Sequence, residues 1–215
     1  MKLGLIGLGY WGSNYLRVLV QLGVDLKYIC DREYGKLENY GKFGKVTSDV
    51  RELAKDKELD AVIIATPASS HYEIAKMMLK SGKHVLIEKP LTTNYAQALE
   101  LQKLSKRLSK ILMVGHIYCF NPAVNYMKKM LGELGSLKYG IGLRLGLGPI
   151  RKDADCIFDL ATHDIAILNY ILGKNPKYVS ANASSFLQEG VYDYASIQFK
   201  YSHGFQFSLI VSWYA

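Results

Sequence analysis

The stretch KLGLIGLGYWGSNYLR, residues 2–17, determines the fold that we predict for this chain. A short apolar run ends at Gly7, and the apolar positions of residues 11–22 recur at the spacing of a helix. A G-x-G-x-x-G pattern lies between the two. In such a turn Gly7 permits a sharp reversal, Gly9 lets a pyrophosphate approach the backbone, and Gly12 lets the helix pack closely on the strand. With a strand before it and a helix after it, the pattern predicts a dinucleotide site.

Two further features of this region support dinucleotide binding. The helix that follows the turn, with Tyr10 and Trp11 at its start, offers free N–H groups and the positive end of its dipole to a phosphate. A second apolar run, residues 24–30, ends in Asp31, where an acid can accept hydrogen bonds from the ribose. Because a carboxylate also repels a 2′-phosphate, Asp31 predicts NAD. The adjacent Arg32 could pair with that phosphate, so NADP stays open.

Strands and helices alternate up to about residue 120. Further strands are predicted from apolar runs at residues 60–65, 84–87 and 111–114. Helices are predicted at residues 36–40, 50–55, 72–81 and 95–108. This alternation indicates a doubly wound parallel sheet, in which ligands bind beyond the carboxyl ends of the strands. The residues at such ends are Thr66, Glu88, Lys89 and His116.

The pattern changes after residue 120. Helices are predicted at residues 123–131 and 159–172, and a strand region broken by glycines at residues 137–147. Three antiparallel strands are predicted at residues 177–186, 192–201 and 205–213. We therefore predict an α/β chain of two domains, a Rossmann domain at residues 1–120 and an α+β domain at residues 121–215. The second domain is expected to contain a large, mainly antiparallel open sheet.

Composition and charge exclude several classes of partner. Of the 215 residues, 49% are hydrophobic, which is enough for one large or two small domains with proper cores. The net charge of +8 raises the question of nucleic acid, but the excess fits solvated helix faces and no nucleic-acid motif is present. No apolar run approaches the length of a membrane span. We predict neither a nucleic-acid partner nor a membrane partner.

The cysteines and histidines are widely spaced. Cys30, Cys119 and Cys156 lie in apolar surroundings, as expected for reduced, buried thiols in a cytoplasmic protein. No two cysteines or histidines lie at ligand spacing, so we predict no metal site.

Three residues could carry out the chemistry of a dehydrogenase. Lys89 follows a strand, and Asp159 and His163 are four apart at a predicted helix start, so that both project from one face. Oxidising a secondary alcohol needs a base for the hydroxyl proton, and a cation near the oxygen stabilises the developing alkoxide. His163, oriented by Asp159, fits the first role and Lys89 the second. The simpler reading is a surface lysine, an acid at a helix start and an unrelated core histidine.

Four motifs in order resemble those of the Gfo/Idh/MocA dehydrogenases: GLGYWG, ATPASSH, EKP and DLATH, at residues 7–12, 65–71, 88–90 and 159–163. The resemblance implies a nicotinamide cofactor and a sugar or cyclitol substrate. It implies that Lys89, Asp159 and His163 are the catalytic residues. It also implies that the nicotinamide side is lined by Thr66, Pro67, His71 and Glu88, although His71 has in part a structural role. Residues 115–123 and 159–165 are most similar to the branch that acts on nucleotide sugars.

Two functions remain open on the sequence alone. The first is an oxidoreductase that transfers hydride between NAD(P) and a secondary hydroxyl of a sugar, cyclitol or nucleotide sugar. The second is a non-catalytic dinucleotide-binding protein or sensor, because members of the family normally continue well past residue 215. The last predicted strand alternates apolar and polar residues, and a strand at a sheet edge or a bare sheet face favours pairing with a second copy. We therefore expect a homodimer or homotetramer built through the second domain's sheet.

Overall fold

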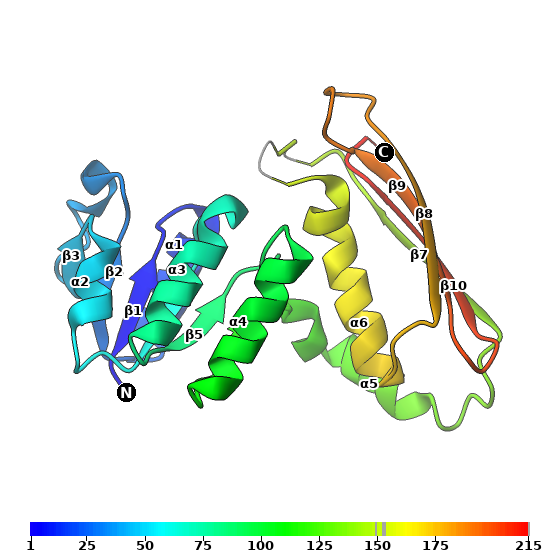
Figure 1. Cartoon of the computed structure of the whole chain (residues 1–215), viewed down its shortest axis with the longest axis horizontal. Coiled ribbons are helices and arrows are strands. Elements are labelled where there is room, and N and C mark those ends of the chain that lie inside the picture. Colours follow the sequence, from blue (N-terminus) through cyan, green and yellow to red (C-terminus); the bar gives the residue numbers. More distant parts are fainter. Residues whose placement is uncertain (149, 152–153, 215) are drawn as a thin grey trace. The chain divides into compact units, whose positions relative to one another are not determined.

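The chain divides into two units, Met1–Gly115 and His116–Ala215, and the sheet of the first unit has six parallel strands (Figure 1). The computed structural model describes residues 1–148, 150–151 and 154–214. The strands are β1 (Leu3–Ile6), β2 (Leu26–Cys30), β3 (Lys45–Thr47), β4 (Ala61–Ile64), β5 (His84–Ile87) and β6 (Leu112–Val114). Their spatial order is β3-β2-β1-β4-β5-β6, and every neighbouring pair is parallel. The order reverses beside β1, so the predicted doubly wound fold is confirmed.

Helices connect these strands. They are α1 (Tyr10–Gln21), α2 (Val50–Lys55), α3 (Ala68–Lys80) and α4 (Tyr95–Arg107). Asp49 and Asn94 act as the N-caps of α2 and α4, because their side chains accept hydrogen bonds from backbone N–H groups of the first turn. Leu5, Ile64 and Ile87 on the central strands are fully buried, as a sheet covered on both faces requires.

Three local predictions for this unit were inaccurate. Residues 36–40 were expected to form a helix, but a 3₁₀ turn occupies Tyr34–Leu37 instead. Helix α3 begins at Ala68 rather than residue 72, because Pro67 has the extended backbone of an N-cap and the Ser70 hydroxyl donates to its carbonyl within the first turn. Strand β3 was not predicted, since three residues are too few to show a periodic pattern.

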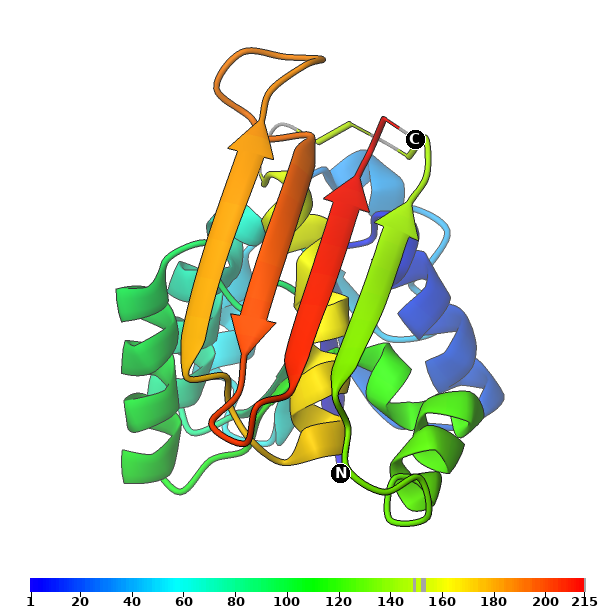
Figure 2. The ribbon, with the colours of Figure 1, turned by 90° about the vertical axis from the view of Figure 1, so that its right-hand side faces the viewer.

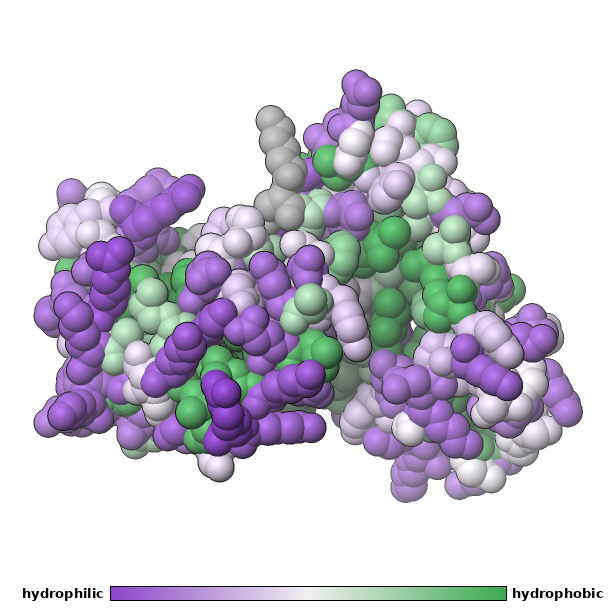
Figure 3. All heavy atoms as spheres, viewed as in Figure 1, coloured by the Kyte–Doolittle hydropathy of each residue, from purple (hydrophilic) through white to green (hydrophobic). Residues whose placement is uncertain are grey.

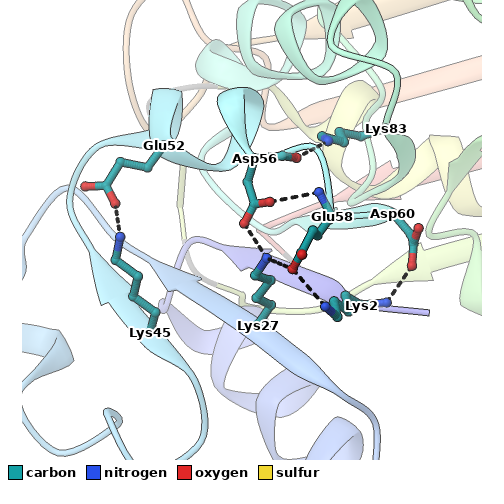
Figure 4. A network of polar contacts seen from close by, with 8 residues as sticks. All are labelled: Lys2, Lys27, Lys45, Glu52, Asp56, Glu58, Asp60 and Lys83. Carbon is teal, nitrogen blue, oxygen red and sulfur yellow. Dashed lines mark hydrogen bonds and ion pairs between the residues drawn. The ribbon is translucent and has the colours of Figure 1, made fainter.

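Ion pairs connect segments at the amino ends of the strands, which is the end of the sheet away from the glycine turn (Figure 4). Lys27 at the start of β2 pairs with Asp56 at 2.7 Å and with Glu58 at 2.9 Å. Lys2 before β1 pairs with the same Glu58 at 2.9 Å, and its backbone N–H donates to Asp60. The Lys27 ammonium lowers the pKa of Asp56 to about 2, so this carboxylate stays charged at all ordinary pH values.

The second unit contains a four-stranded sheet (Figure 2). Its strands are β7 (Tyr139–Leu145), β8 (Tyr178–Ser184), β9 (Tyr194–Lys200) and β10 (Gln206–Ser212). The order is β7-β10-β9-β8, with antiparallel pairs throughout except for β7, which runs parallel to β10. The helices of this unit are α5 (Pro122–Met130) and α6 (Thr162–Leu172), with a 3₁₀ turn at Ile117–Phe120 and a π-helical turn at Ile157–Ala161. A mainly antiparallel sheet is thus confirmed.

The inner face of this sheet is apolar. On β10 the predicted alternation is present: Leu209 and Val211 are fully buried, and Gln206 on the other face is exposed. Gly140 and Gly142 on β7 leave room for the Phe207 ring, because a Cβ at either position would lie less than 3 Å from that ring. However, β10 lies between β7 and β9, so of the two expected alternatives, an exposed edge at the last strand or a bare sheet face, the exposed edge is excluded. The edge strands are β7 and β8.

The outer face of the same sheet carries an apolar stripe along its β7 edge. Tyr139, Ile141, Leu143 and Leu145 alternate with inward-facing residues and are exposed to 78%, 66%, 62% and 48%. We call these four residues the β7 stripe. Contiguous exposed apolar side chains of this kind mark a surface that is covered by a partner in many proteins.

One face of the first unit is largely polar. Figure 3 shows hydrophilic side chains over much of the face of the first unit that carries α3 and α4. Lys76 on α3 pairs there with Glu100 on α4 at 2.7 Å, while Lys103, Lys106 and Arg107 lie on exposed turns of α4. Across residues 1–148, 150–151 and 154–214, each helix is too short or too polar to cross a lipid bilayer.

Candidate functional site

A pocket of about 320 Å³ lies at the carboxyl ends of β1, β2 and β4. Six residues predicted from the sequence line it: Gly7, Gly9, Asp31, Arg32, Thr66 and Pro67. The sequence reasoning missed Glu33, Lys36, Ser48, Ser69 and Ser70, which also line it. Ser48 follows β3, the strand that was not predicted, and the two serines lie in the first turn of α3, which was expected to be a loop.

The three glycines of the turn have different surroundings. Gly7 has a φ of +94°, and a Cβ there would lie 2.7 Å from the Ala65 carbonyl oxygen. A Cβ on Gly12 would lie 1.9 Å from the Gly7 carbonyl oxygen, so the start of α1 is in contact with the turn itself. Gly9 has no heavy atom within 4 Å of its Cβ position. The turn therefore needs Gly7 and Gly12 for its own shape, and Gly9 leaves open space above the backbone.

Asp31 is fixed by the turn that it faces. One carboxylate oxygen accepts the Leu8 N–H at 2.7 Å, and the other accepts the Glu33 N–H at 2.9 Å. Each oxygen keeps a second lone pair for a ligand hydroxyl. Beside it, the Lys36 ammonium donates to Glu33 at 2.8 Å, and this bond raises the pKa of Lys36. The charges around the pocket mouth are therefore two acids, Asp31 and Glu33, against two bases, Arg32 and Lys36.

These residues fit a dinucleotide. Open space above Gly9 beside the N-terminus of α1 suits a pyrophosphate. A fixed carboxylate at the end of β2 suits the ribose hydroxyls, and the apolar side chains of Val50 and Ile74 in the pocket lining suit a base. Tyr10 and Trp11 lie at the start of α1, exposed to 80% and 41%, with their rings edge to face at 5.6 Å.

Lys89 lies in a turn that is held on both sides. Its N–H donates to the Glu88 carboxylate at 3.2 Å, and the Lys89–Pro90 peptide bond is cis. On the far side, Nδ1 of His71 lies 2.8 Å from the Pro90 carbonyl oxygen, and Nε2 lies 2.9 Å from the Thr66 carbonyl oxygen. A neutral imidazole donates to one of these carbonyls, and an imidazolium donates to both. The buried His71 ring thus joins the ends of β4 and β5.

Asp159 and His163 are both buried in the second unit. Asp159 lies in the π-helical turn, whose wider coil precedes α6, and such turns are frequent at functional sites. Its two carboxylate oxygens accept from Arg151 Nη1 and from the indole N–H of Trp213, each at 3.2 Å. Neither donor was singled out from the sequence. Arg151 lies in a glycine-rich loop and Trp213 follows β10, so no spacing connects them with Asp159.

His163 is part of a second cluster in the same unit. Its ring is T-shaped to that of Tyr118, with 4.9 Å between centroids, and the Arg144 guanidinium lies over the Tyr118 ring, 4.7 Å from the centroid. Arg144 also donates through two nitrogens to the carboxylate of Asp164, the residue after His163. His116 is half-buried at the N-cap of the Ile117–Phe120 turn. Lys89 belongs to the first unit, and the other residues of the predicted catalytic set belong to the second.

Two sequence profiles of one family match the chain. The first, an oxidoreductase family with an NAD-binding Rossmann fold, covers residues 1–116, and the second, the GFO/IDH/MocA C-terminal domain, covers residues 149–215. The UDP-N-acetylglucosamine 3-dehydrogenase of Acidithiobacillus ferrooxidans is 30% identical over 84% of this chain and 57% of its own length. The inositol 2-dehydrogenase 2 of Saccharopolyspora erythraea is 29% identical over 89% of this chain and 59% of its own length.

The fold gives the same result. The solved structure of the Acidithiobacillus ferrooxidans enzyme superposes with a TM-score of 0.88 at 27% identity, and covers 100% of this chain and 70% of that one. This chain spans less than two thirds of the length of the curated relatives it matches. The family profile extends over more than half of the chain, through the glycine turn, the pocket and the Lys89 turn. The chain therefore belongs to the Gfo/Idh/MocA oxidoreductase family, and its first unit is the NAD-binding Rossmann domain of that family.

Proposed function

We propose that this protein is an NAD-dependent dehydrogenase that moves hydride between the cofactor and a secondary hydroxyl of a sugar, cyclitol or nucleotide sugar. The observation that carries the proposal is a dinucleotide pocket at the glycine turn in a chain whose two parts both match the family. In this proposal residues 1–120 bind the cofactor and residues 121–215 bind substrate. The relatives named above, a UDP-N-acetylglucosamine 3-dehydrogenase and an inositol 2-dehydrogenase, support that substrate range.

The proposed roles follow from the chemistry of each side chain. Bound NAD supplies the hydride acceptor. Lys89 stabilises negative charge on the substrate oxygen, and His163 accepts the hydroxyl proton. Asp159, held by Arg151 and Trp213, keeps a fixed negative charge one helical turn before His163, where a carboxylate favours an imidazolium. Thr66, Pro67, His71, Glu88 and His116 shape the nicotinamide side of the site.

The function is tested by absorbance at the reduced-nicotinamide band. Purified protein with NAD is mixed with a panel of hexoses, inositols and UDP-sugars, and each reverse reaction is tested with the reduced cofactor and the corresponding keto compound. We expect turnover with at least one nucleotide sugar. If cofactor binds but no compound is turned over, the chain is a dinucleotide-binding protein without activity.

Cofactor preference is a separate prediction. We expect NAD to bind at least about tenfold more tightly than NADP, because the 2′-phosphate would approach Asp31 while Glu33 neutralises Lys36. Titration of each reduced cofactor into apo-protein, followed by nicotinamide fluorescence, measures both dissociation constants. Tighter binding of NADP would show that Arg32 outweighs the two acids.

The β7 stripe supports assembly of two copies. We propose a homodimer or dimer of dimers through the outer face of the four-stranded sheet, since a two-fold axis would bring two stripes together and remove them from water. Light scattering at micromolar concentration should give at least twice the monomer mass. Leu143→Glu should give monomer, while the control Leu134→Glu, at a leucine 68% exposed outside the sheet, should assemble normally. A well-behaved wild-type monomer would contradict the proposal.

A cytoplasmic location is proposed from the thiols. Cys30, Cys119 and Cys156 are all free, and burial raises the pKa of Cys30 and of Cys156 to about 12 each. Cys119 is only half-buried, which differs from the expectation that all three are buried. Three thiols without a disulfide fit a reducing compartment.

A further inference from the structure

The phenol of Tyr15 is the feature of the first unit that neither the glycine motif nor the family motifs explain. Tyr15 lies in the second turn of α1, the helix that starts at the glycine turn. Its hydroxyl donates to the Glu88 carboxylate at 2.8 Å, across 73 positions in the sequence. Glu88 is 7% exposed and is the residue directly before Lys89. The hydrogen bond therefore connects the helix at the pyrophosphate position with the turn that carries the proposed catalytic lysine.

Glu88 is held at both of its oxygens. Oε1 accepts from Tyr15, and Oε2 accepts the backbone N–H of Lys89 at 3.2 Å. Because the carboxylate is planar and rigid, fixing one oxygen determines where the other lies. Burial, and then the Glu88 charge, raise the pKa of Tyr15, so the phenol keeps its proton and continues to donate.

Gly115 provides the room for this contact. It follows β6, the strand next to β5, so Glu88 and Gly115 stand side by side at the carboxyl ends of two paired strands. A Cβ on Gly115 would lie 3.2 Å from Glu88 Oε1 and 3.3 Å from the Tyr15 hydroxyl oxygen. Helix α1, the end of β5 and the end of β6 thus converge on a single hydrogen bond.

We propose that Tyr15 is a positioning residue, which acts through Glu88 to fix the backbone of Lys89 relative to the cofactor-binding helix. The proposal rests on the function proposed above for Lys89. His71 holds the other side of the same turn through Pro90, so the turn is restrained from two helices. A lysine that must meet a substrate oxygen in one geometry needs such support, because small errors in placement cost large factors in rate.

The first test reads the backbone directly. In Tyr15→Phe the ring remains and only the donor is lost, so the fold is retained and Glu88 is free to turn. We expect the Lys89 amide to exchange with deuterium about tenfold faster than in the wild type, read by NMR, since a hydrogen bond to a charged group is worth about that factor. The amide of Val85 in the middle of β5 should keep its rate. The control Tyr95→Phe, at a tyrosine 81% exposed, should change neither rate.

The second test reads the consequence for catalysis. Tyr15→Phe should lower kcat by about tenfold or more, with KM for NAD and the cofactor dissociation constant unchanged. Gly115→Ala, which leaves the phenol in place but pushes a methyl group against the pair, should shift both readouts in the same direction. A general loss of stability would instead weaken cofactor binding and speed exchange throughout β5.

The possible outcomes separate this proposal from the proposed function. Faster exchange at Lys89 with lower kcat supports Tyr15 as a positioning residue. Unchanged exchange at Lys89, or faster exchange with unchanged kcat in an active enzyme, overturns it. If the wild type turns over no substrate, the proposed dehydrogenase function fails. The exchange rate of the Lys89 amide in Tyr15→Phe then decides by itself whether Tyr15 fixes the Lys89 backbone.

Discussion

Lys89→Ala is expected to lower turnover by about a thousandfold, the loss seen when one group that stabilises a developing oxyanion is removed. The ammonium is the charge nearest to the substrate oxygen in the proposed mechanism, and no other basic residue lies in the turn at the end of β5. The change should act on kcat, because the developing alkoxide carries more charge than the bound alcohol. The dissociation constant for NAD should stay within about twofold, since Lys89 does not line the pocket around Asp31.

The measurement is steady-state kinetics on the best substrate of the panel, together with a cofactor titration. Lys103→Ala serves as the control. It removes the same charge from the same unit, but on the exposed face of α4 and not in the turn that carries Lys89. Its kinetics should equal those of the wild type. Turnover unchanged in Lys89→Ala would remove this residue from the mechanism, and equal losses in both variants would indicate a general electrostatic effect.

The first unit could be predicted well because its signals are local. Each strand of the parallel sheet except β3 is mostly apolar, with Lys27 in β2 and His84 at the start of β5 as the polar exceptions, and each helix has a cap or a glycine within a few residues of its end. The glycine turn was enough to predict where the cofactor pocket lies, and Asp31 was predicted from its position at the end of the next strand. Lys36 and Ser48 could not be found in this way, because they reach the pocket from segments without a periodic pattern.

The contacts that hold the site residues were not predictable. Tyr15 and Glu88 are 73 positions apart, and Asp159 and Trp213 are 54 positions apart. In each pair the two residues meet only after the sheet has formed, so no sequence spacing connects them. The parallel pairing of β7 with β10 has the same origin, since β7 lies three strands before β10 in the chain yet beside it in the sheet. For this reason the sequence left open whether the last strand lies at an edge or carries a bare face.

Gly12→Ala is expected to lower stability and Gly9→Ala to lower NAD affinity, although both remove a glycine from one turn. Gly12→Ala should lower the free energy of unfolding by about 3 kcal/mol, because the new methyl group would lie 1.9 Å from the Gly7 carbonyl oxygen and backbone has to move. Helix propensity alone predicts the reverse, since alanine within a helix is better than glycine by about 1 kcal/mol. The clash outweighs this gain in propensity, so the melting temperature should fall.

Gly9→Ala should melt like the wild type. No heavy atom lies within 4 Å of the added methyl group, and the Gly9 backbone, with φ −76° and ψ −161°, is open to alanine. NAD affinity should nevertheless fall by about 10–100-fold, because the methyl group occupies the space through which a pyrophosphate reaches the backbone N–H groups, and a hydrogen bond to a charged group is worth about 1.5–3 kcal/mol.

Thermal unfolding of the free proteins and cofactor titration together separate the two roles. If Gly12→Ala melts at or above the wild type, α1 can move away from the turn and close packing is not what the third glycine provides. If Gly9→Ala binds NAD normally, the pyrophosphate lies elsewhere, and the open space above the turn has a different occupant. The two glycines are three positions apart, and only their surroundings in the folded chain predict which substitution costs stability and which costs affinity.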